Sequence, residues 1–152
     1  METNSDTLSN VGPDNEHEPS RGVLRFFTGW RAVQEGAIRP GGALVVDYDP
    51  DRLSVCRRRF RELDIWNVTA YIRFHPGGQL HEQSVLEAIR AGPGGSGPVV
   101  NHRPRLIEIA VPMDATRVEL WFHTFSEWPT GGLCSEWDSR FGQNYWFDVA
   151  RG

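Results

Sequence analysis

Residues 66–74 read Trp-Asn-Val-Thr-Ala-Tyr-Ile-Arg-Phe, and this short run decides the fold class. Apolar side chains stand at every second position, and the residues between them carry a polar group or a phenol ring. Successive side chains of a β-strand point to opposite faces, so the alternation predicts a strand with one face toward a core. That face holds Trp66, Val68, Ala70, Ile72 and Phe74.

Similar apolar runs recur on both sides of this stretch, separated by turn sequences rich in glycine and proline. Strands are predicted at residues 23–28, 43–48, 52–60, 106–111, 118–125 and 145–149, and residues 84–91 fit either a short helix or a strand. Roughly seven to nine short strands without a long amphipathic helix are typical of an antiparallel β-sandwich. The sequence therefore predicts an all-β fold, a single antiparallel β-sandwich, with a flattened β-barrel as the alternative.

Composition divides the chain into a tail and one domain. Residues 1–21 are polar and acidic with almost nothing apolar, so they cannot bury enough surface to fold and are predicted to be disordered. Residues 22–152 are predicted to form the single sandwich domain, because a chain of 152 residues suffices for one core but not for two ordinary ones.

Charge and hydropathy exclude several classes of partner. The net charge of −4 argues against nucleic acid as the main partner. No apolar run approaches the roughly 20 residues that span a bilayer, so a membrane is not expected as a partner either. The first residues lack the basic start and apolar stretch of a secretory signal, which predicts a cytoplasmic protein. In that compartment Cys56 and Cys134 are expected to be free, buried thiols.

Two predicted strands carry aromatic side chains on the face that points away from the core. In residues 118–125, Phe122 shares the face of the aliphatic residues and Trp121 lies on the opposite face. In residues 144–149, Phe147 belongs to the core set, which leaves Trp146 facing outward. Exposed aromatic patches usually mark binding sites, so Trp121 and Trp146 predict an aromatic platform. The alternative is that a loop or the N-terminal tail covers these rings.

The stretch from Glu136 to Asp148 combines aromatic rings with amides and carboxylates. A pyranose ring has apolar C–H faces that stack on Trp or Tyr, and its hydroxyls need fixed donors and acceptors, so this mixture suits a sugar-binding surface. The same residues could equally close the core of a sandwich. The candidate ligand-binding residues are Trp121, Trp128, Trp137, Asp138, Asn144, Tyr145 and Trp146.

Residues 137–145, Trp-Asp-Ser-Arg-Phe-Gly-Gln-Asn-Tyr, resemble the closing motif of starch- and glycogen-binding modules, such as those of glycogen-targeting phosphatase subunits and some amylases. The motif of those modules reads Trp-Asp-Asn-Asn and then Gly-x-Asn-Tyr. It is matched at Trp137, Asp138, Gly142, Asn144 and Tyr145, whereas Ser139 and Arg140 replace the paired asparagines. The resemblance implies a β-sandwich and an α-glucan ligand, without the contacts of the two replaced positions.

Residues 22–150 as a whole resemble a bacterial family of unknown function. The stretches that carry this second resemblance include Phe74-His-Pro-Gly-Gly78, Glu119-Leu-Trp-Phe122 and the motif of residues 137–145. It implies no activity.

Patterns for catalysis or metal binding do not stand out. The side chains of His75, His81, His102 and His123 are scattered without the spacing of a metal pair, and no nucleophile or phosphate-loop motif is present. No catalytic residue, metal or cofactor is therefore predicted. The leading function is a non-catalytic binding module for a glycan. The alternatives are a protein-interaction or accessory domain that uses the same aromatic face, and a small β-barrel enzyme that acts on a hydrophobic metabolite.

Overall fold

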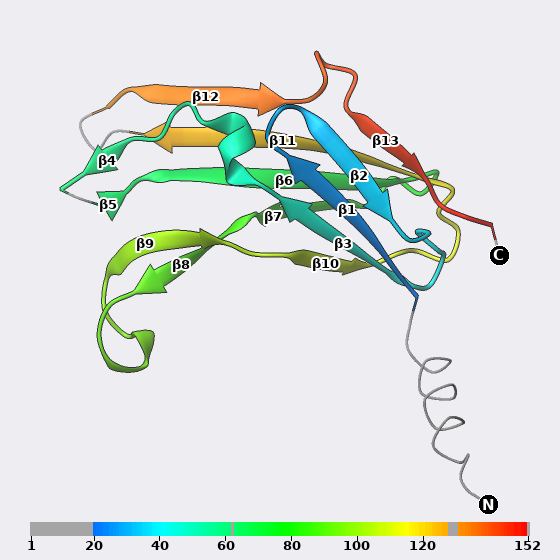
Figure 1. Cartoon of the computed structure of the whole chain (residues 1–152), viewed down its shortest axis with the longest axis horizontal. Helices are drawn as coiled ribbons and strands as arrows, with labels where there is room; N and C mark the ends of the chain where they lie inside the picture. The colour runs from blue at the N-terminus through cyan, green and yellow to red at the C-terminus, as the bar shows by residue number, and fades with distance from the viewer. Residues whose placement is uncertain (1–19, 62, 128–130, 152) are drawn as a thin grey trace, which may run out of the picture.

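The computed structural model describes residues 20–61, 63–127 and 131–151, and within them two β-sheets pack against each other (Figure 1). The first sheet has the strand order β10 (Ile107–Ala110), β3 (Ala43–Tyr48), β1 (Arg21–Phe27) and β2 (Arg31–Glu35). The second sheet contains β12 (Leu133–Asp138), β11 (Arg117–Glu127), β6 (Trp66–His75) and β7 (Leu80–Ser84), and β13 (Tyr145–Asp148) also pairs with β11. The predicted all-β fold is confirmed.

Two hairpins extend the sandwich at the end opposite the C-terminus (Figure 1). One pairs β4 (Arg59–Phe60) with β5 (Leu63–Asp64), and the other pairs β8 (Leu86–Arg90) with β9 (Val99–Pro104). Two short 3-10 helices, Pro50–Leu53 and Pro93–Gly95, complete the elements. Over the described residues, we find no helix with the length and apolar character needed to cross a membrane.

The core fills the space between the two sheets, and the alternation seen in the sequence places it. Val68, Ala70, Ile72 and Phe74 of β6 are fully buried, and Trp66 packs against their margin. On β11 the predicted inward set is also buried, namely Val118, Leu120, Phe122 and Thr124. The first sheet meets them with an aromatic and aliphatic layer made of Leu24, Phe26, Leu44, Val46, Tyr48 and Ile107.

One strand pair runs in parallel, which the sequence did not indicate. Strand β1 pairs with β3 in parallel, from Arg21 opposite Ala43 onward, while the other described pairs are antiparallel. The connection from β2 to β3 has to cross the start of β1 to reach its far side. It passes so close to Gly22 that a Cβ there would lie 2.8 Å from Cγ1 of the buried Ile38. Glycine permits this crossing, because it carries no side chain.

The strand predicted over residues 52–60 is wrong. The chain turns into the 3-10 helix at Pro50 and regains strand structure only at β4. The side chain of Asp49 accepts a hydrogen bond from the backbone N–H of Asp51 at 2.9 Å, and Pro50 supplies the fixed backbone angle of a first helical position. The turn directs Arg52 and Leu53 into the interior.

Five strands of the described residues, β2, β5, β7, β9 and β12, were not marked by the periodicity. Strands β2, β9 and β12 are mostly exposed on both faces and β7 has no buried residue, so these sequences lack the apolar alternation that marks a half-buried strand. Residues 84–91, which fitted either a helix or a strand, contain the end of β7 and the strand β8. The predicted tail falls almost wholly on residues 1–19, outside the described residues, and Arg21 already pairs in β1.

The prediction of two free thiols is also wrong. Cys56 and Cys134 form a disulfide with a Cα–Cα distance of 5.4 Å, within the usual range for such bridges. It ties the segment that follows the first 3-10 helix to the second residue of β12. Because 78 residues separate the two cysteines, the pairing depended on the fold and could not be inferred from their spacing.

Candidate functional site

A buried ion pair lies beneath the candidate site. Arg52 and Asp138 have side chains only 0% and 1% exposed, and the Arg52 Nε donates to Asp138 Oδ2 at 2.9 Å. The hydroxyl of Tyr48 donates to the same carboxylate oxygen at 2.7 Å, and the hydroxyl of Tyr145 donates to Oδ1 at 2.6 Å. The two sheets are thus joined through one carboxylate.

Arg52 uses its remaining donors to hold the surrounding backbone. Its Nη1 donates to the carbonyl oxygens of Phe27 and Arg31, at either end of the turn between β1 and β2. Its Nη2 donates to the hydroxyl of Tyr145 at 2.9 Å and, at 3.5 Å, to Asp138 Oδ1. All five N–H groups of the guanidinium therefore have partners, which is the condition under which a buried charge is tolerated.

The two tyrosines stay protonated in this cluster. Burial, reinforced by the Asp138 carboxylate, raises the pKa of Tyr145 to about 12, and the same causes raise the pKa of Tyr48 further. Burial alone would lower the pKa of Arg52, but its hydrogen bond and charge interaction with Asp138 outweigh that effect and raise it. The cluster is therefore a permanent set of donors around one acceptor over the physiological pH range.

A six-residue loop projects from the edge of the second sheet directly above this cluster. Asp138 pairs with Phe122 and Tyr145 pairs with Leu120, so residues 139–144 bulge out opposite the single residue Trp121. The backbone N–H of Asn144 donates to the carbonyl of Ser139 at 2.6 Å and closes the loop. The Asp138–Tyr145 hydrogen bond ties the two strand ends together beneath it.

The loop holds three non-glycine residues in left-handed backbone conformations: Arg140 (φ 53°), Phe141 (φ 59°) and Asn144 (φ 64°). Such conformations are unfavourable for residues that carry a Cβ, and they concentrate at functional sites. The Phe141 side chain is 104% exposed, so no burial of its ring compensates for its conformation.

Polar contacts on the outer face of the second sheet fix the end of the loop. Asn144 Nδ2 donates to Glu119 Oε2 at 2.6 Å, and His75 Nε2 lies 2.8 Å from Glu119 Oε1. Burial alone would raise the pKa of Glu119, but these two hydrogen bonds outweigh it and lower the pKa below its ordinary value. Glu119 therefore stays ionised and keeps Asn144 in place.

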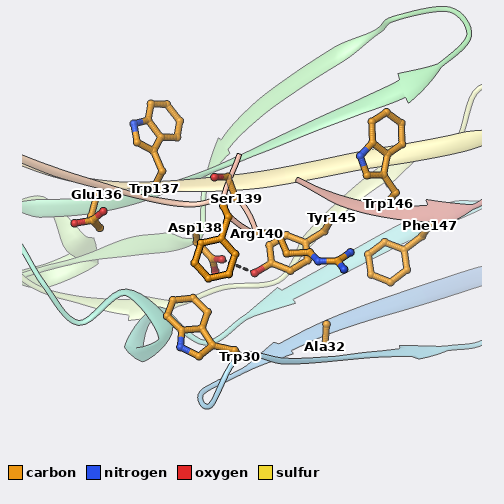
Figure 2. A pocket seen from close by; sticks show the side chains of 11 residues that line it. Trp30, Ala32, Glu136, Trp137, Asp138, Ser139, Arg140, Tyr145, Trp146 and Phe147 are labelled. Carbon is orange, nitrogen blue, oxygen red and sulfur yellow. Dashed lines mark hydrogen bonds between the residues drawn. The ribbon is translucent and has the colours of Figure 1, made fainter. Parts of the chain in front are cut away.

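Beside the loop, an open groove of about 910 Å³ lies at the edge of the sandwich, between the turn before β2 and the strands β12 and β13. Figure 2 shows Trp137 and Trp146 on one side of the strand edge and Trp30 on the other, with the hydrogen-bonded Asp138 and Tyr145 between them. Trp30 is 63% exposed, Trp137 51% and Trp146 37%. The remaining lining residues are Ala32, Glu136, Ser139, Arg140, Phe141 and Phe147.

The predicted orientations of the aromatic residues are confirmed by strand register and burial. Trp121 pairs with Tyr71 and Trp146 pairs with Glu119, both on the face away from the core. Phe122 is fully buried, and Phe147 is half-buried and packs against the core. Trp121 does not line the groove, whereas Trp137 and Trp146 on the same face of the sheet do.

The other candidate residues divide into three groups. Trp137 and Trp146 line the groove with exposed rings, while Asp138 and Tyr145 point inward and form its floor. Asn144 closes the loop, and Trp128 lies outside the described residues. The role of each as a ligand contact stays a prediction.

Sequence reasoning missed Trp30, Phe141 and Arg52. Trp30 lies in the turn between β1 and β2, far in the sequence from the other tryptophans of the groove, and the pairing of β1 with β2 brings it there. Its position after Thr28-Gly29 offered one signal, since a large aromatic residue in a turn has little to pack against. Over the described residues, no group of three or more His, Cys, Asp or Glu side chains is arranged to hold a metal ion.

Comparison with known families and proteins places the chain. The model of the Family of unknown function (DUF6209) matches residues 4–150. The chain belongs to this family. The predicted resemblance to a family of unknown function is thereby confirmed, and DUF6209 carries no described activity. No curated protein and no solved structure gave a match. The likeness of residues 137–145 to starch-binding modules stays a prediction.

Proposed function

We propose that the protein is a non-catalytic module that binds a glycan in the groove between the sheet edges. One observation carries the proposal: three tryptophans, Trp30 from the first sheet's turn and Trp137 and Trp146 from either side of the 139–144 loop, line one solvent-open groove. Indole rings present flat apolar faces, and these stack on the C–H faces of pyranose rings. The volume of about 910 Å³ lies in the range of pockets that take small organic ligands.

The polar groups of the groove support the same ligand class. Glu136, Ser139 and Arg140 stand among the aromatic rings and offer acceptors and donors for hydroxyl groups. The oxygens of Asp138 already accept hydrogen bonds from Arg52 and both tyrosines. We therefore assign Asp138 and Tyr145 a shaping role beneath the loop, and the contacts with sugar to the tryptophans. The starch-module motif favours an α-glucan as the first glycan to test.

The shape of the groove distinguishes this proposal from the alternatives. An enzyme for a hydrophobic metabolite would enclose its substrate, whereas Trp30, Trp137 and Phe141 are each more than half exposed. A protein partner is favoured by one feature, the fully exposed ring of Phe141 at the loop, since exposed aromatic residues often anchor protein interfaces. Glycan binding accounts for the three tryptophans together.

A pair of variants tests the proposal. Trp30→Asn removes the indole while keeping a residue type that tolerates the left-handed backbone of position 30 (φ 61°). Leu106→Ala is the control, because Leu106 is 59% exposed and does not line the groove. We expect wild type and Leu106→Ala to bind insoluble starch or spots of a glycan array, and Trp30→Asn to bind weakly. If wild type retains no glycan, the proposal fails and the partner or enzyme alternatives move ahead.

The disulfide bears on where the protein works. Cytosolic reductants keep most thiols reduced, whereas bridges persist in oxidising compartments. We therefore favour an oxidising compartment over the predicted cytoplasm, on the strength of the Cys56–Cys134 bridge. Alkylation of the native protein under non-reducing conditions, followed by mass spectrometry, tests this proposal. Two modified cysteines in protein isolated from its natural source would restore the cytoplasmic assignment.

A further inference from the structure

The outer face of the second sheet carries a continuous line of aromatic rings. Successive ring centroids lie 5.5 Å apart from Trp121 to Tyr71, 6.1 Å from Tyr71 to Trp137, 4.0 Å from Trp137 to His123 and 6.2 Å from His123 to Phe125. We call these five residues the aromatic strip. It crosses β6, β11 and β12, and Trp137 belongs both to the strip and to the groove.

The outer face of the first sheet has a different character. There Arg25 pairs with Asp47 and with Glu35, and Arg21 pairs with Glu108, so ion pairs form much of that face, beside the exposed Val33. Exposed ion pairs of this kind are common on solvated protein surfaces, so they give no indication of a ligand. The aromatic strip, in contrast, keeps Phe125 39% exposed and Trp137 51% exposed, on a face that could have been covered by charged residues.

Around His123 and Phe125, the cross-strand neighbours of the strip are polar and uncharged. Cross-strand pairing places Thr69 beside His123, Asn67 and Ser135 beside Phe125, and Ser84 beside Thr69. Burial lowers the pKa of His123, so its ring is neutral at neutral pH. At the other end, Arg73 lies over Trp121 and is balanced by the ionised Glu119, and the exposed Glu82 pairs across from Tyr71. The strip thus complements an uncharged ligand that is apolar along its middle and hydroxylated at its edges.

We propose that the aromatic strip continues the groove, and that the ligand is an uncharged linear glycan chain long enough to occupy both. This inference rests on the proposed glycan-binding function and specifies its ligand. Four residues of β11 separate Trp121 from Phe125, which corresponds to about 13 Å along the strand, longer than one pyranose ring. Tyr71 lies beside Trp121 and Trp137 lies beside His123, so the strip is at most two rings wide, a width that a single sugar chain can cover. A protein partner would instead need a broad patch, on the order of 800 Å² for a stable interface.

The test compares chain length with the integrity of the strip. The probe is an array that carries length ladders of neutral glucans, mannans, xylans, galactans and chitin, from disaccharides to heptasaccharides, together with acidic polysaccharides. The proteins are wild type, Trp121→Ala and Phe125→Ala, because these two rings lie at the ends of the strip and do not line the groove. Leu80→Ala is the control, since Leu80 is 42% exposed on the same face outside the strip.

We expect wild type and Leu80→Ala to bind long chains more tightly than short ones. Loss of one stacking ring should weaken binding of the longest chain roughly 2- to 10-fold and leave disaccharide binding unchanged. Unfolding curves show whether Trp121→Ala and Phe125→Ala fold. If one of them does not fold, the binding measured with the other tests the inference. Three results would overturn the inference and leave glycan binding in place. They are equal affinity of wild type for chains of every length, wild-type affinity of both strip variants for the longest chain, and binding of acidic polysaccharides alone. Absence of binding to every glycan overturns both.

Discussion

Replacing Asp138 by alanine would test whether the buried cluster holds the sandwich together. The change leaves the guanidinium of Arg52 buried, with side-chain exposure of 0%, and without its counter-charge. It also removes the acceptor of the Tyr48 and Tyr145 hydroxyl groups. Breaking a buried ion pair by removal of one partner costs about 3–5 kcal/mol. For a domain of this size, that corresponds to a fall in the midpoint of thermal unfolding of roughly 6–20 °C.

The assay is urea unfolding followed by tryptophan fluorescence, together with a thermal melt. Asp47→Ala is the matched control, because the ion pair of Asp47 with Arg25 is about one-third exposed on the outer face of the first sheet. Loss of such an exposed pair should change the stability little. If Asp138→Ala is as stable as Asp47→Ala but loses glycan binding, the carboxylate contacts ligand, and the structural role that we assign to it is wrong.

Four further outcomes are expected. Phe122→Ala should lose about 3–5 kcal/mol in a denaturant titration because its ring is fully buried, whereas Trp146→Ala should lose far less and impair binding; equal losses would make Trp146 an ordinary core residue. Phe141→Gly should raise the free energy of unfolding by about 0.5–1 kcal/mol, since glycine accepts the left-handed backbone of position 141. A lower free energy of unfolding would show that the ring packs in solution. Reducing the disulfide should lower the stability by about 2–4 kcal/mol in paired unfolding curves with and without reductant, and coincident curves would contradict this. The pKa of Tyr145 is raised to about 12 in the folded protein, so its hydroxyl should contribute its full stabilisation below about pH 10 and lose it as the pH rises toward 12. The free energy of unfolding should fall less steeply with pH in Tyr145→Phe, and an unchanged slope would count against the buried hydroxyl.

The strands that sequence reasoning recovered are those with one buried face. Strands β6 and β11 alternate because each has a core side and an outer side, and the register of side chains follows directly. Strand β3 reads as an apolar run, because five of its six residues are buried. The edge strands β2 and β12 leave no such pattern. Their residues are mostly exposed, so no periodic burial selects their side chains.

The site could be predicted in its parts but not in its assembly. Alternation around Phe122 and Tyr145 was enough to place Trp121 and Trp146 off the core face. The inward direction of Asp138 depended on the pairing of β12, a strand that the sequence did not reveal, and its partner Arg52 lay in a segment wrongly predicted as a strand. Trp30 reached the groove only through the hairpin of β1 and β2.

By itself, the sequence determined the all-β class, the core side of the central strands and the outward direction of two tryptophans, because these follow from local periodicity. The tertiary structure alone decided the parallel pairing of β1 with β3, the disulfide, the buried ion pair and the position of Trp30 and Trp137 along the same groove. Each of these joins residues far apart in the chain. Such contacts form only when the sheets pack, since the burial of the shared core compensates for the entropy lost in bringing the distant segments together.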